Sequence, residues 1–449
     1  MNAIRRLRPL DLTWVLPWTV LAVAAIQPIR DNSFLWHVRA GSVQIVDGSV
    51  LTADPFSFTR AGASWRTQSW LAELAFGWLD VRMGLAFVPS VVFAAFAVVF
   101  LGVWLLAREA NRSPLVPAAI MLAAAWTGAA FMNPRPAVFS FGLIVLVLLA
   151  SRPKLRWALP LLMWVWASVH ASFALGFIIV CAESLRRTRA IPWRDLVPMG
   201  VATLLTAHGI GVVEFLLGFV RSSGALDHLS EWRTPSFVSL PFLLVIPIVL
   251  ALFAGAARGR LDLSELWIVG PALFLLASSV RAVLPGFLLL LPSLARSLGE
   301  FRVVRGRTSS RESELLAVLG IGLLIGFPSA LRSAELFEEG RFPVVAAGHL
   351  ESDRPYSDDV ASAFLIYSTW PEHGVFVDDR AELYGAAFFA DALEVRSGTP
   401  TWQEVFTAYE IDEALVRVDD GLAVELIAAG WREQHRDEHF LVLSRPDSG

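Results

Sequence analysis

Charged residues and cysteine are both scarce in this 449-residue chain. Asp, Glu, Lys and Arg make up 17% of it, hydrophobic residues make up 55%, and the mean hydropathy is +0.57. Average soluble domains carry about 25% charged residues, so the composition predicts an integral membrane protein. The single cysteine, Cys181, excludes an intramolecular disulfide and leaves the compartment unspecified.

Several motifs are missing as well. No basic patch with interleaved aromatic residues suggests a nucleic-acid partner, and no internal repeat suggests a transporter built from paired halves. The tail has no Gly-rich phosphate loop and no metal-ligand spacing. Its acidic pairs, Asp358-Asp359 and Asp378-Asp379, are therefore interpreted as solvated loop charges. No metal ligand is assigned, and a divalent metal stays open as a cofactor.

Charge divides the chain in two. Residues 1–330 hold 28 Lys and Arg against 17 Asp and Glu, a net charge of +11, whereas residues 331–449 hold 9 against 24, a net charge of −15. We expect a multi-span membrane domain over residues 1–330, with its first extracytoplasmic loop at 30–84, and a soluble extracytoplasmic domain over 331–449. For that tail the patterns predict a small α/β fold, with strands at Gly374–Asp378, Glu413–Val418 and Phe440–Ser444 and a helix at Leu422–Ala429.

The apolar runs predict about eleven transmembrane helices. Arg5, Arg6 and Arg8 precede the first run and hold the N-terminus in the cytoplasm, unless that run is a cleaved signal peptide. The expected spans are Trp14–Ile29, Leu85–Ala107, Leu115–Met132, Ala137–Ala150, two within Trp157–Leu185, Val197–Val220, Phe237–Ala254, Leu266–Val280, Leu284–Leu298 and Leu315–Ala330.

Two of these runs are predicted to break. A break near His170 keeps Arg186 and Arg187 on the cytoplasmic side, as the positive-inside rule requires, and a second break is expected at His208-Gly209. Every dense basic cluster then lies inside and the acidic tail lies outside. Several spans are short, which favours broken or tilted helices around a cavity.

With this orientation a set of ionisable side chains collects at the outer face. Such groups are costly at membrane depth and usually line a site or a pathway. A carboxylate can take the proton of an acceptor hydroxyl, and arginines can hold a phosphate as it leaves. We expect Asp31 to be the base and Glu73 a second candidate catalytic carboxylate. The expected substrate contacts are His37, Arg135, His170, Glu231, Arg233 and Arg281.

Each assignment has a structural alternative. Asp31 would be a solvated helix end, and Glu73 would lie on a surface face. Arg135 would extend to the lipid headgroups, and His170 would satisfy backbone groups at its helix break. Glu231 and Arg233 would pair with each other. An interfacial belt, with sugar stacking as its alternative, would account for the tryptophans Trp36, Trp65, Trp70 and Trp232.

The chain resembles a bacterial multi-pass family related to GT-C-type glycosyltransferases, the class of the protein mannosyltransferases and the lipid A aminoarabinose transferases. The resemblance covers nearly the whole chain, and its first two segments are the most specific. It rests on DNSFLWHVRAG, TADPFSFTRAG, SWLAEL, NPRP, WASVHASF, EWRTPSF, SSVRAVLP and VFVDDRAELYG.

The resemblance implies a site as well as a fold. In this class an acidic residue just after the first span is the catalytic base or a metal-associated carboxylate, and Asp31 matches it. A polyprenyl-phosphate sugar donor is also implied, with outer-face arginines near its phosphate. Two departures weaken the case for a metal. Ser33 stands where relatives often carry a second acidic residue, and Thr67 and Gln68 stand where they often carry acidic residues.

We therefore expect a GT-C-like glycosyltransferase in the bacterial cytoplasmic membrane. It would move a sugar from a polyprenyl-phosphate donor to an unidentified envelope acceptor on the extracytoplasmic face, with the lipid bilayer as its other partner. The alternative is a non-catalytic transporter or scaffold subunit for envelope lipid or polysaccharide assembly, since short broken helices around a polar cavity also suit transport.

Overall fold

The computed structural model describes residues 27–111, 113, 115–221, 233–239, 242–299 and 335–446, which form two compact units. The helical unit contains residue 27 and residues 85–299, and the mixed unit combines residues 28–84 with residues 335–446. The sequence predicts residues 30–84 as a loop of the membrane domain. In the structure, these residues belong to the same unit as the tail.

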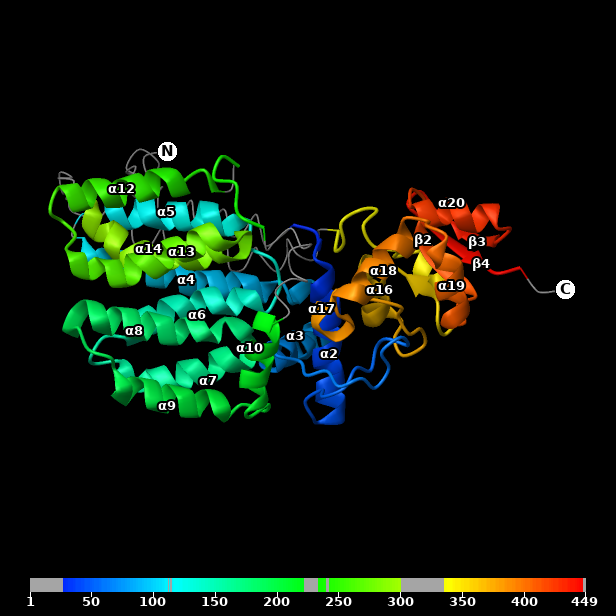
Figure 1. Cartoon of the computed structure of the whole chain (residues 1–449), viewed down its shortest axis with the longest axis horizontal. Coiled ribbons are helices and arrows are strands. Elements are labelled where there is room, and N and C mark those ends of the chain that lie inside the picture. The colour runs from blue at the N-terminus through cyan, green and yellow to red at the C-terminus, as the bar shows by residue number, and fades with distance from the viewer. Residues whose placement is uncertain are drawn as a thin grey trace, which may run out of the picture. The chain divides into compact units, whose positions relative to one another are not determined.

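Most helices of the helical unit run alongside one another, and α10 is drawn across their direction (Figure 1). Helix α14 lies at its centre, where it packs against α4, α5, α6, α12 and α13, and every residue from Val283 to Ala295 is buried. The helices are α4 (Ser90–Ala110), α5 (Leu115–Ala129), α6 (Ala137–Ala150), α7 (Leu159–Val169), α8 (Ala174–Thr188), α9 (Trp193–Leu204), α10 (Gly211–Arg221), α12 (Val245–Ala257), α13 (Leu266–Ser278) and α14 (Val283–Ser297).

Large apolar side chains also cover the outside of this unit. Leu101, Leu161, Phe253 and Phe274 are 54%, 60%, 65% and 71% exposed. A soluble protein seldom exposes apolar surface on this scale, whereas lipid chains are a favourable partner for it. The outer face of the helical unit therefore fits a membrane setting.

The structure confirms the predicted helix breaks. Helix α7 ends at Val169, His170 is extended at φ −165° and ψ 143°, and the chain resumes through the 3₁₀ turn η4 (Ala171–Phe173) into α8. A second break separates α9 from α10 around Gly209, whose φ is +53°. A third break, at Ser279, separates α13 from the 3₁₀ turn η8 (Val280–Ala282) that leads into α14.

Because of these breaks, most apolar helices are short. Among the described residues, two stretches are long and apolar enough to cross a bilayer, Leu85–Ala110 and Val280–Ser297. The shorter apolar stretches in this unit are Leu115–Ala129, Ala137–Ala150, Val245–Ala257 and Leu263–Ser278. The expected spans at Trp14–Ile29 and Leu315–Ala330 lie outside the described residues, except for residues 27–29.

The mixed unit contains the small C-terminal sheet that the sequence predicts. Its order is β1-β2-β4-β3, with β1 parallel to β2 and the other pairs antiparallel. The strands are β1 (Tyr356–Ser357), β2 (Glu413–Arg417), β3 (Arg432–Arg436) and β4 (Phe440–Ser444). The helices are α2 (Asn32–Asp47), α3 (Trp70–Met83), α16 (Asp359–Ser368), α17 (Ala381–Tyr384), α18 (Ala386–Arg396), α19 (Thr401–Ala408) and α20 (Gly421–Ala428).

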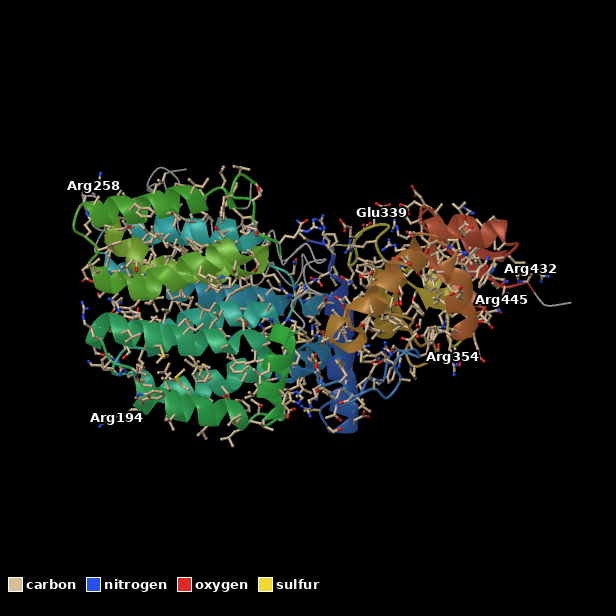
Figure 2. All side chains as sticks on the ribbon, in the orientation of Figure 1. Arg194, Arg258, Glu339, Arg354, Arg432 and Arg445 are labelled. Atoms are coloured by element: carbon tan, nitrogen blue, oxygen red, sulfur yellow. The ribbon has the colours of Figure 1, made fainter. Side chains whose placement is uncertain are left out.

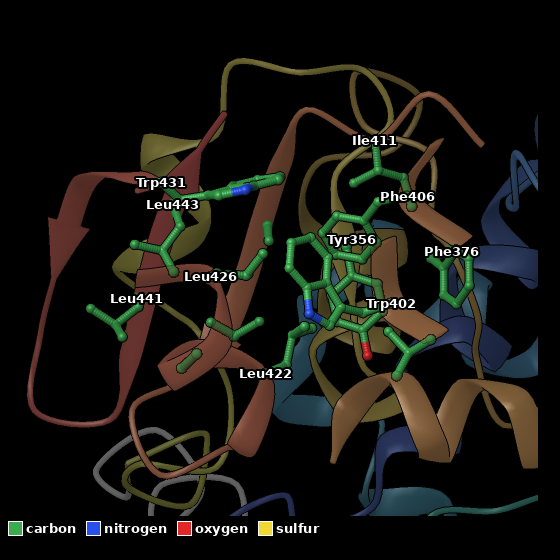
Figure 3. Packing of buried hydrophobic residues seen from close by; sticks show 14 of the residues in the cluster. Tyr356, Phe376, Trp402, Phe406, Ile411, Leu422, Leu426, Trp431, Leu441 and Leu443 are labelled. Atoms are coloured by element: carbon green, nitrogen blue, oxygen red, sulfur yellow. The ribbon is translucent and has the colours of Figure 1, made fainter. Parts of the chain in front are cut away.

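Aromatic side chains fill the core of this unit. Figure 3 shows Tyr356, Phe406 and Trp402 packed between the sheet and its helices, together with Trp431. Ring centroids of Phe406 and Trp431 are 5.6 Å apart in an edge-on arrangement, which aromatic pairs favour. The core therefore has enough buried aromatic surface to hold a four-stranded sheet.

One predicted strand is wrong. Gly374–Asp378 forms no strand, and only Val375 makes a bridge, to Ser57 of the N-terminal segment. The Val375 N–H donates to the Phe56 carbonyl and the Phe58 N–H donates to the Val375 carbonyl, each at 3.1 Å. Pairing stops there because the Asp378 side chain accepts from the Arg380 N–H at 3.0 Å and turns the chain.

Helices α2 and α3 touch backbone to backbone. A Cβ at Gly41 would lie 1.8 Å from the Glu73 carbonyl oxygen, and a Cβ at Gly77 would lie 2.4 Å from the Gly41 backbone. Only glycine permits this approach. The crossing places residues on α2 within hydrogen-bonding reach of the first turn of α3, where Glu73 lies.

Candidate active site

Asp31 lies at the start of α2, as its N-cap residue. Its backbone is extended, with φ −87° and ψ 117°. The sixteen residues of α2 are followed by the C-cap Gly48 in the left-handed region, with φ +65°. Asp and Gly at these two positions are the residues that start and stop helices. Asp31 is 7% exposed, so the alternative of a solvated helix end is wrong.

Two carboxylates of the tail bind the first turn of α2. Asp379 accepts hydrogen bonds from the Ser33 hydroxyl and from the Trp36 indole, the latter at 2.6 Å. Asp359 accepts from the Asn32 amide at 3.2 Å. The N-terminus of a helix is its positive end, which makes anions favourable there. Asp31 is therefore followed directly by a turn that gathers two more acidic side chains.

A buried ion-pair network lies close by in the same unit. Arg380 is 1% exposed and donates from Nε and Nη2 to Asp378, at 2.8 and 2.5 Å, and from Nη1 to Asp54 at 2.7 Å. The Tyr384 hydroxyl donates to Asp378 at 3.0 Å. Burial alone would lower the pKa of Arg380, but the charges and hydrogen bonds of these carboxylates raise it above its ordinary value. Asp378 is 0% exposed, so its interpretation as a solvated loop charge is wrong.

Tryptophans surround this network. The Arg380 guanidinium lies 4.5 Å from the ring centroid of Trp65 and 5.8 Å from that of Trp36, within cation–π range. Trp65 also donates to Glu382 at 3.1 Å, and both tryptophans are buried. Trp36 and Trp65 are therefore not part of an exposed interfacial belt, and Trp232 lies outside the described residues.

Glu73 lies at a second polar centre, between α2 and α3. It is 0% exposed and accepts from the His37 ring Nδ1 at 2.9 Å, from the Gln44 amide at 2.8 Å and from the Thr67 hydroxyl. The alternative of a surface face is wrong. Three side chains that the first segment supplies thus close around one carboxylate. We propose that Glu73 and His37 position α2 through this cluster.

Replacing Glu73 with glutamine tests this role. His37, Gln44 and Thr67 all donate to the Glu73 carboxylate, so the NH₂ group of a glutamine side chain would face at least one donor and leave it without an acceptor. A buried polar group without a partner costs about 1–3 kcal/mol. We expect the midpoint of thermal unfolding of the detergent-purified chain to fall by several degrees. Glu404→Gln, at an exposed glutamate of α19, is the matched control. An unchanged midpoint with loss of activity would instead make Glu73 a catalytic residue.

Ion pairs at one end of the helical unit establish how its helices run. Arg186, near the end of α8, binds Glu265 just before α13 at 3.3 Å, and Arg296, near the end of α14, binds the same glutamate at 2.6 Å. Figure 2 shows Arg194 and Arg258 projecting from this end. The start of α8, the end of α13 and the start of α14 therefore lie at the other end.

That other end carries four of the predicted substrate contacts. Arg281 lies in η8, and the Val280 N–H next to it donates to the Arg233 carbonyl at 3.0 Å. Arg135 lies in the turn just before α6. His170 reaches that helix through two hydroxyls, because Ser172 binds both the His170 Nδ1, at 2.8 Å, and the Ser140 hydroxyl, at 2.9 Å.

His170 also has the structural role given as its alternative. Its Nδ1 accepts from the Ser172 N–H at 3.2 Å and so caps the turn after the helix break. Glu231 lies outside the described residues. Within the part of the chain that the structure describes, no three His, Cys, Asp or Glu side chains are placed to hold a metal ion. The candidate site residues thus fall into two groups. The mixed unit has the first turn of α2 with its carboxylates, and the helical unit has Arg233 and Arg281.

Comparison with known proteins gives one fold. No family model and no curated protein matches the sequence. Among solved structures, the crystal structure of ArnT from Cupriavidus metallidurans bound to undecaprenyl phosphate matches with a TM-score of 0.55 and 14% identity, over 97% of this chain and 98% of that one. The chain has the fold of ArnT. At this identity the similarity concerns the fold, and it agrees with the GT-C resemblance of the sequence.

Sequence reasoning missed the links between the first segment and the tail. Asp54 and Arg380 are 326 positions apart and Ser33 and Asp379 are 346 apart, so no local pattern connects them. One signal was present. TADPFSFTRAG and VFVDDRAELYG both carry the family resemblance, and the structure brings them together through Asp54, Ser57 and Thr59.

Proposed function

We propose that this protein is an integral membrane glycosyltransferase of GT-C type. It transfers a sugar from a polyprenyl-phosphate donor to an envelope acceptor on the extracytoplasmic face. The observation that carries the proposal is the similarity of fold to ArnT over 97% of this chain. The ArnT crystal structure holds undecaprenyl phosphate. The apolar outer face of the helical unit and the charge asymmetry of the sequence support the membrane location and the orientation.

In the proposed reaction Asp31 is the general base. Its carboxylate takes the proton of an acceptor hydroxyl as that oxygen attacks the anomeric carbon of the donor sugar. The bond between the anomeric carbon and the phosphate oxygen breaks, and its electron pair leaves with the polyprenyl phosphate. The negative charge that grows on that phosphate is offset by Arg135, Arg233 and Arg281. A guanidinium group can donate two parallel hydrogen bonds to two phosphate oxygens.

The acidic turn of α2 supports this role for Asp31. Asp379 is held by Ser33 and Trp36, two and five positions after Asp31, and so stands beside the serine where relatives often carry an acid. We assign Asp379 as a second carboxylate of the site, supplied by the tail. His37 and Glu73 act through α2 by fixing its position against α3.

Replacing Asp31 with asparagine tests the proposal. We expect the variant to bind polyprenyl-phosphate sugars like the wild type and to lose at least 100-fold in transfer, since positioned general bases contribute about 10²–10⁴-fold. The measurement is binding and turnover of a panel of such donors in detergent. Asp47→Asn, at the exposed far end of the same helix, is the control.

The outcomes separate the alternatives. Full transfer activity in Asp31→Asn would overturn the assigned base. Saturable donor binding without turnover by the wild-type protein would favour a scaffold or transport role. Loss of binding on replacing Arg281 with glutamine, with an unchanged melting midpoint, would support its phosphate contact.

A further inference from the structure

A charged cavity in the mixed unit lies beside the segment that carries Asp31. Its lining residue Arg341 donates to the Arg30 carbonyl, and Asp359, next to the lining residue Asp358, accepts from the Asn32 amide. The volume of the cavity is about 320 Å³, and its lining includes Arg341, Arg396, Arg417, Asp358 and Phe440. Small-molecule sites in proteins usually measure about 300–1,000 Å³. The cavity is therefore at the lower end of that range, with room for a ligand of the size of one substituted sugar ring.

The cavity lies where the parallel strands of the sheet end. Strands β1 and β2 pair in parallel, β1 ends at Ser357 next to Asp358, and β2 ends at Arg417. Asp358 then caps α16 by accepting from the Ala361 N–H at 2.7 Å, and Asp420 precedes α20. Ligands of open α/β sheets bind outside the carboxyl ends of parallel strands, beside such helix starts.

The lining of this cavity is rich in arginine, although the tail as a whole has a net negative charge. Residues 331–449 hold nine Lys and Arg, all of them arginine, against 24 Asp and Glu, yet three of the nine arginines line this cavity. Arg396 pairs with both acids, through 3.2 Å contacts from Nη1 to Asp358 and from Nε to Asp420. The other two arginines, Arg341 and Arg417, line the cavity together with Glu339, and Asp419 binds Arg417.

The arginines are held with part of each guanidinium unused. Arg417 donates from Nη1 to the Gly340 carbonyl at 2.8 Å and from Nε to Asp419 at 3.1 Å, and it lies 5.4 Å from the Phe440 ring centroid. Arg341 donates from Nε to the Arg30 carbonyl. Neither Nη group of Arg341, nor Nη2 of Arg417, has a hydrogen-bond partner among the described residues. Fixed guanidiniums with free N–H groups are suited to bind an anion through two oxygens.

We propose that this cavity binds a small anionic sugar, one that carries a carboxylate or a phosphate group. Arg341 and Arg417 would bind the anionic group, and Glu339 and Asp358 on the lining would accept hydrogen bonds from ring hydroxyls. The test below measures binding without any polyprenyl-phosphate donor, so its outcome can be distinguished from that of the proposed transferase activity.

The test is direct binding to the full-length chain in detergent, by titration calorimetry. The probes are glucuronate, glucose 6-phosphate, inorganic phosphate and neutral glucose. We expect at least one of the two anionic sugars to bind saturably and at least 10-fold more tightly than glucose. Replacing Arg341 with glutamine should weaken that binding by 10-fold or more. Arg354→Gln is the matched control, because Arg354 projects from the surface of the same unit (Figure 2).

Each outcome decides the proposal. No binding of either anionic sugar by the wild type, or equal binding of glucose, would overturn it. Equal affinity for inorganic phosphate and glucose 6-phosphate would overturn the sugar component. Unchanged affinity in Arg341→Gln, with the melting midpoint of the wild type, would move the ligand away from this cavity. An Arg396→Lys variant that stays folded and loses affinity would add support, since lysine keeps the charge and loses the planar fork.

Discussion

Replacing Arg380 with leucine is expected to destabilise the mixed unit by about 3–5 kcal/mol, the usual cost of removing one partner from a buried ion pair. Arg380 is the only cation that the structure places against both Asp54 and Asp378 among the described residues, and the side chains of all three are 0% exposed. Without it, two carboxylates stay buried with no countercharge. For a domain of this size the change corresponds to a fall of about 6–20 °C in the melting midpoint.

The measurement is thermal unfolding of the detergent-purified chain, followed by tryptophan fluorescence because Trp36 and Trp65 lie against the Arg380 guanidinium. Arg354→Leu, at an arginine whose side chain is 52% exposed, should leave the midpoint within about 2 °C, as surface pairs contribute little. A wild-type midpoint in Arg380→Leu would contradict the network.

A compensating variant separates lost charge from lost packing. In the triple variant Asp54→Asn, Asp378→Asn, Arg380→Met, no uncompensated charge is left and a long apolar side chain fills part of the space. Replacing a buried ion pair with neutral groups of similar volume is often close to neutral. We therefore expect the triple variant to recover much of the stability that Arg380→Leu loses. Recovery would show that the buried charges, rather than the tryptophan contacts, account for the loss.

The network also shows why an N-terminal segment and a C-terminal tail form one unit. Asp54 binds Arg380, Ser57 bridges Val375, Thr59 donates to the Phe376 carbonyl at 2.7 Å, and Ser33 binds Asp379. Each link joins residues more than 300 positions apart. The turn that carries Asp31 is thus fixed by the tail, and a change in the tail is expected to reach the proposed base.

Sequence patterns predicted elements that local residues determine. Helix α6 and strand β4 match their predicted bounds, Ala137–Ala150 and Phe440–Ser444, because each is a mostly apolar run between residues that end it, Pro136 and Ser151 for α6 and His439 and Arg445 for β4. The break at His170 was also predicted, since the positive-inside rule required a hairpin there. Periodicity and charge placement were sufficient for these features.

The same reasoning failed where the partner of a charged residue is distant in the chain. Asp378 was interpreted as a solvated loop charge because no metal-ligand spacing surrounds it, yet Arg380 and Tyr384 make its burial favourable. The surface alternative for Glu73 rested on the amphipathic segment around it, whereas His37 and Gln44 of α2 cover this carboxylate. Desolvation of a carboxylate is decided by its donors, and local sequence does not specify where those donors lie in space.

Asp359, the first residue of α16, binds Asn32 in the first turn of α2 and makes stability depend on pH. Burial raises the pKa of Asp359 from an ordinary value of 3.8 to about 7, with further increases from the charges of Asp358 and Asp379 and a decrease from that of Arg396. Between those two pH values the folded state holds a proton that the unfolded state has released. The contribution of this group to stability is therefore complete near pH 4 and is lost as the pH rises through about 7.

We expect the melting midpoint of the chain to fall between pH 5 and pH 8, with Asp359 responsible for on the order of 3 kcal/mol, since each pH unit inside the window is worth at most about 1.4 kcal/mol. Asp359→Asn is neutral at every pH and can still accept from Asn32. It should match the wild type near pH 4, exceed it by an increasing margin from pH 5 to pH 8 and show a flatter profile. Burial also raises the pKa of Asp420 and Glu413, so the difference between variant and wild type isolates Asp359.

Asp391→Asn, at an exposed position of α18, should keep the wild-type profile. Parallel profiles for Asp359→Asn and the wild type would mean that Asp359 is ionised across this range.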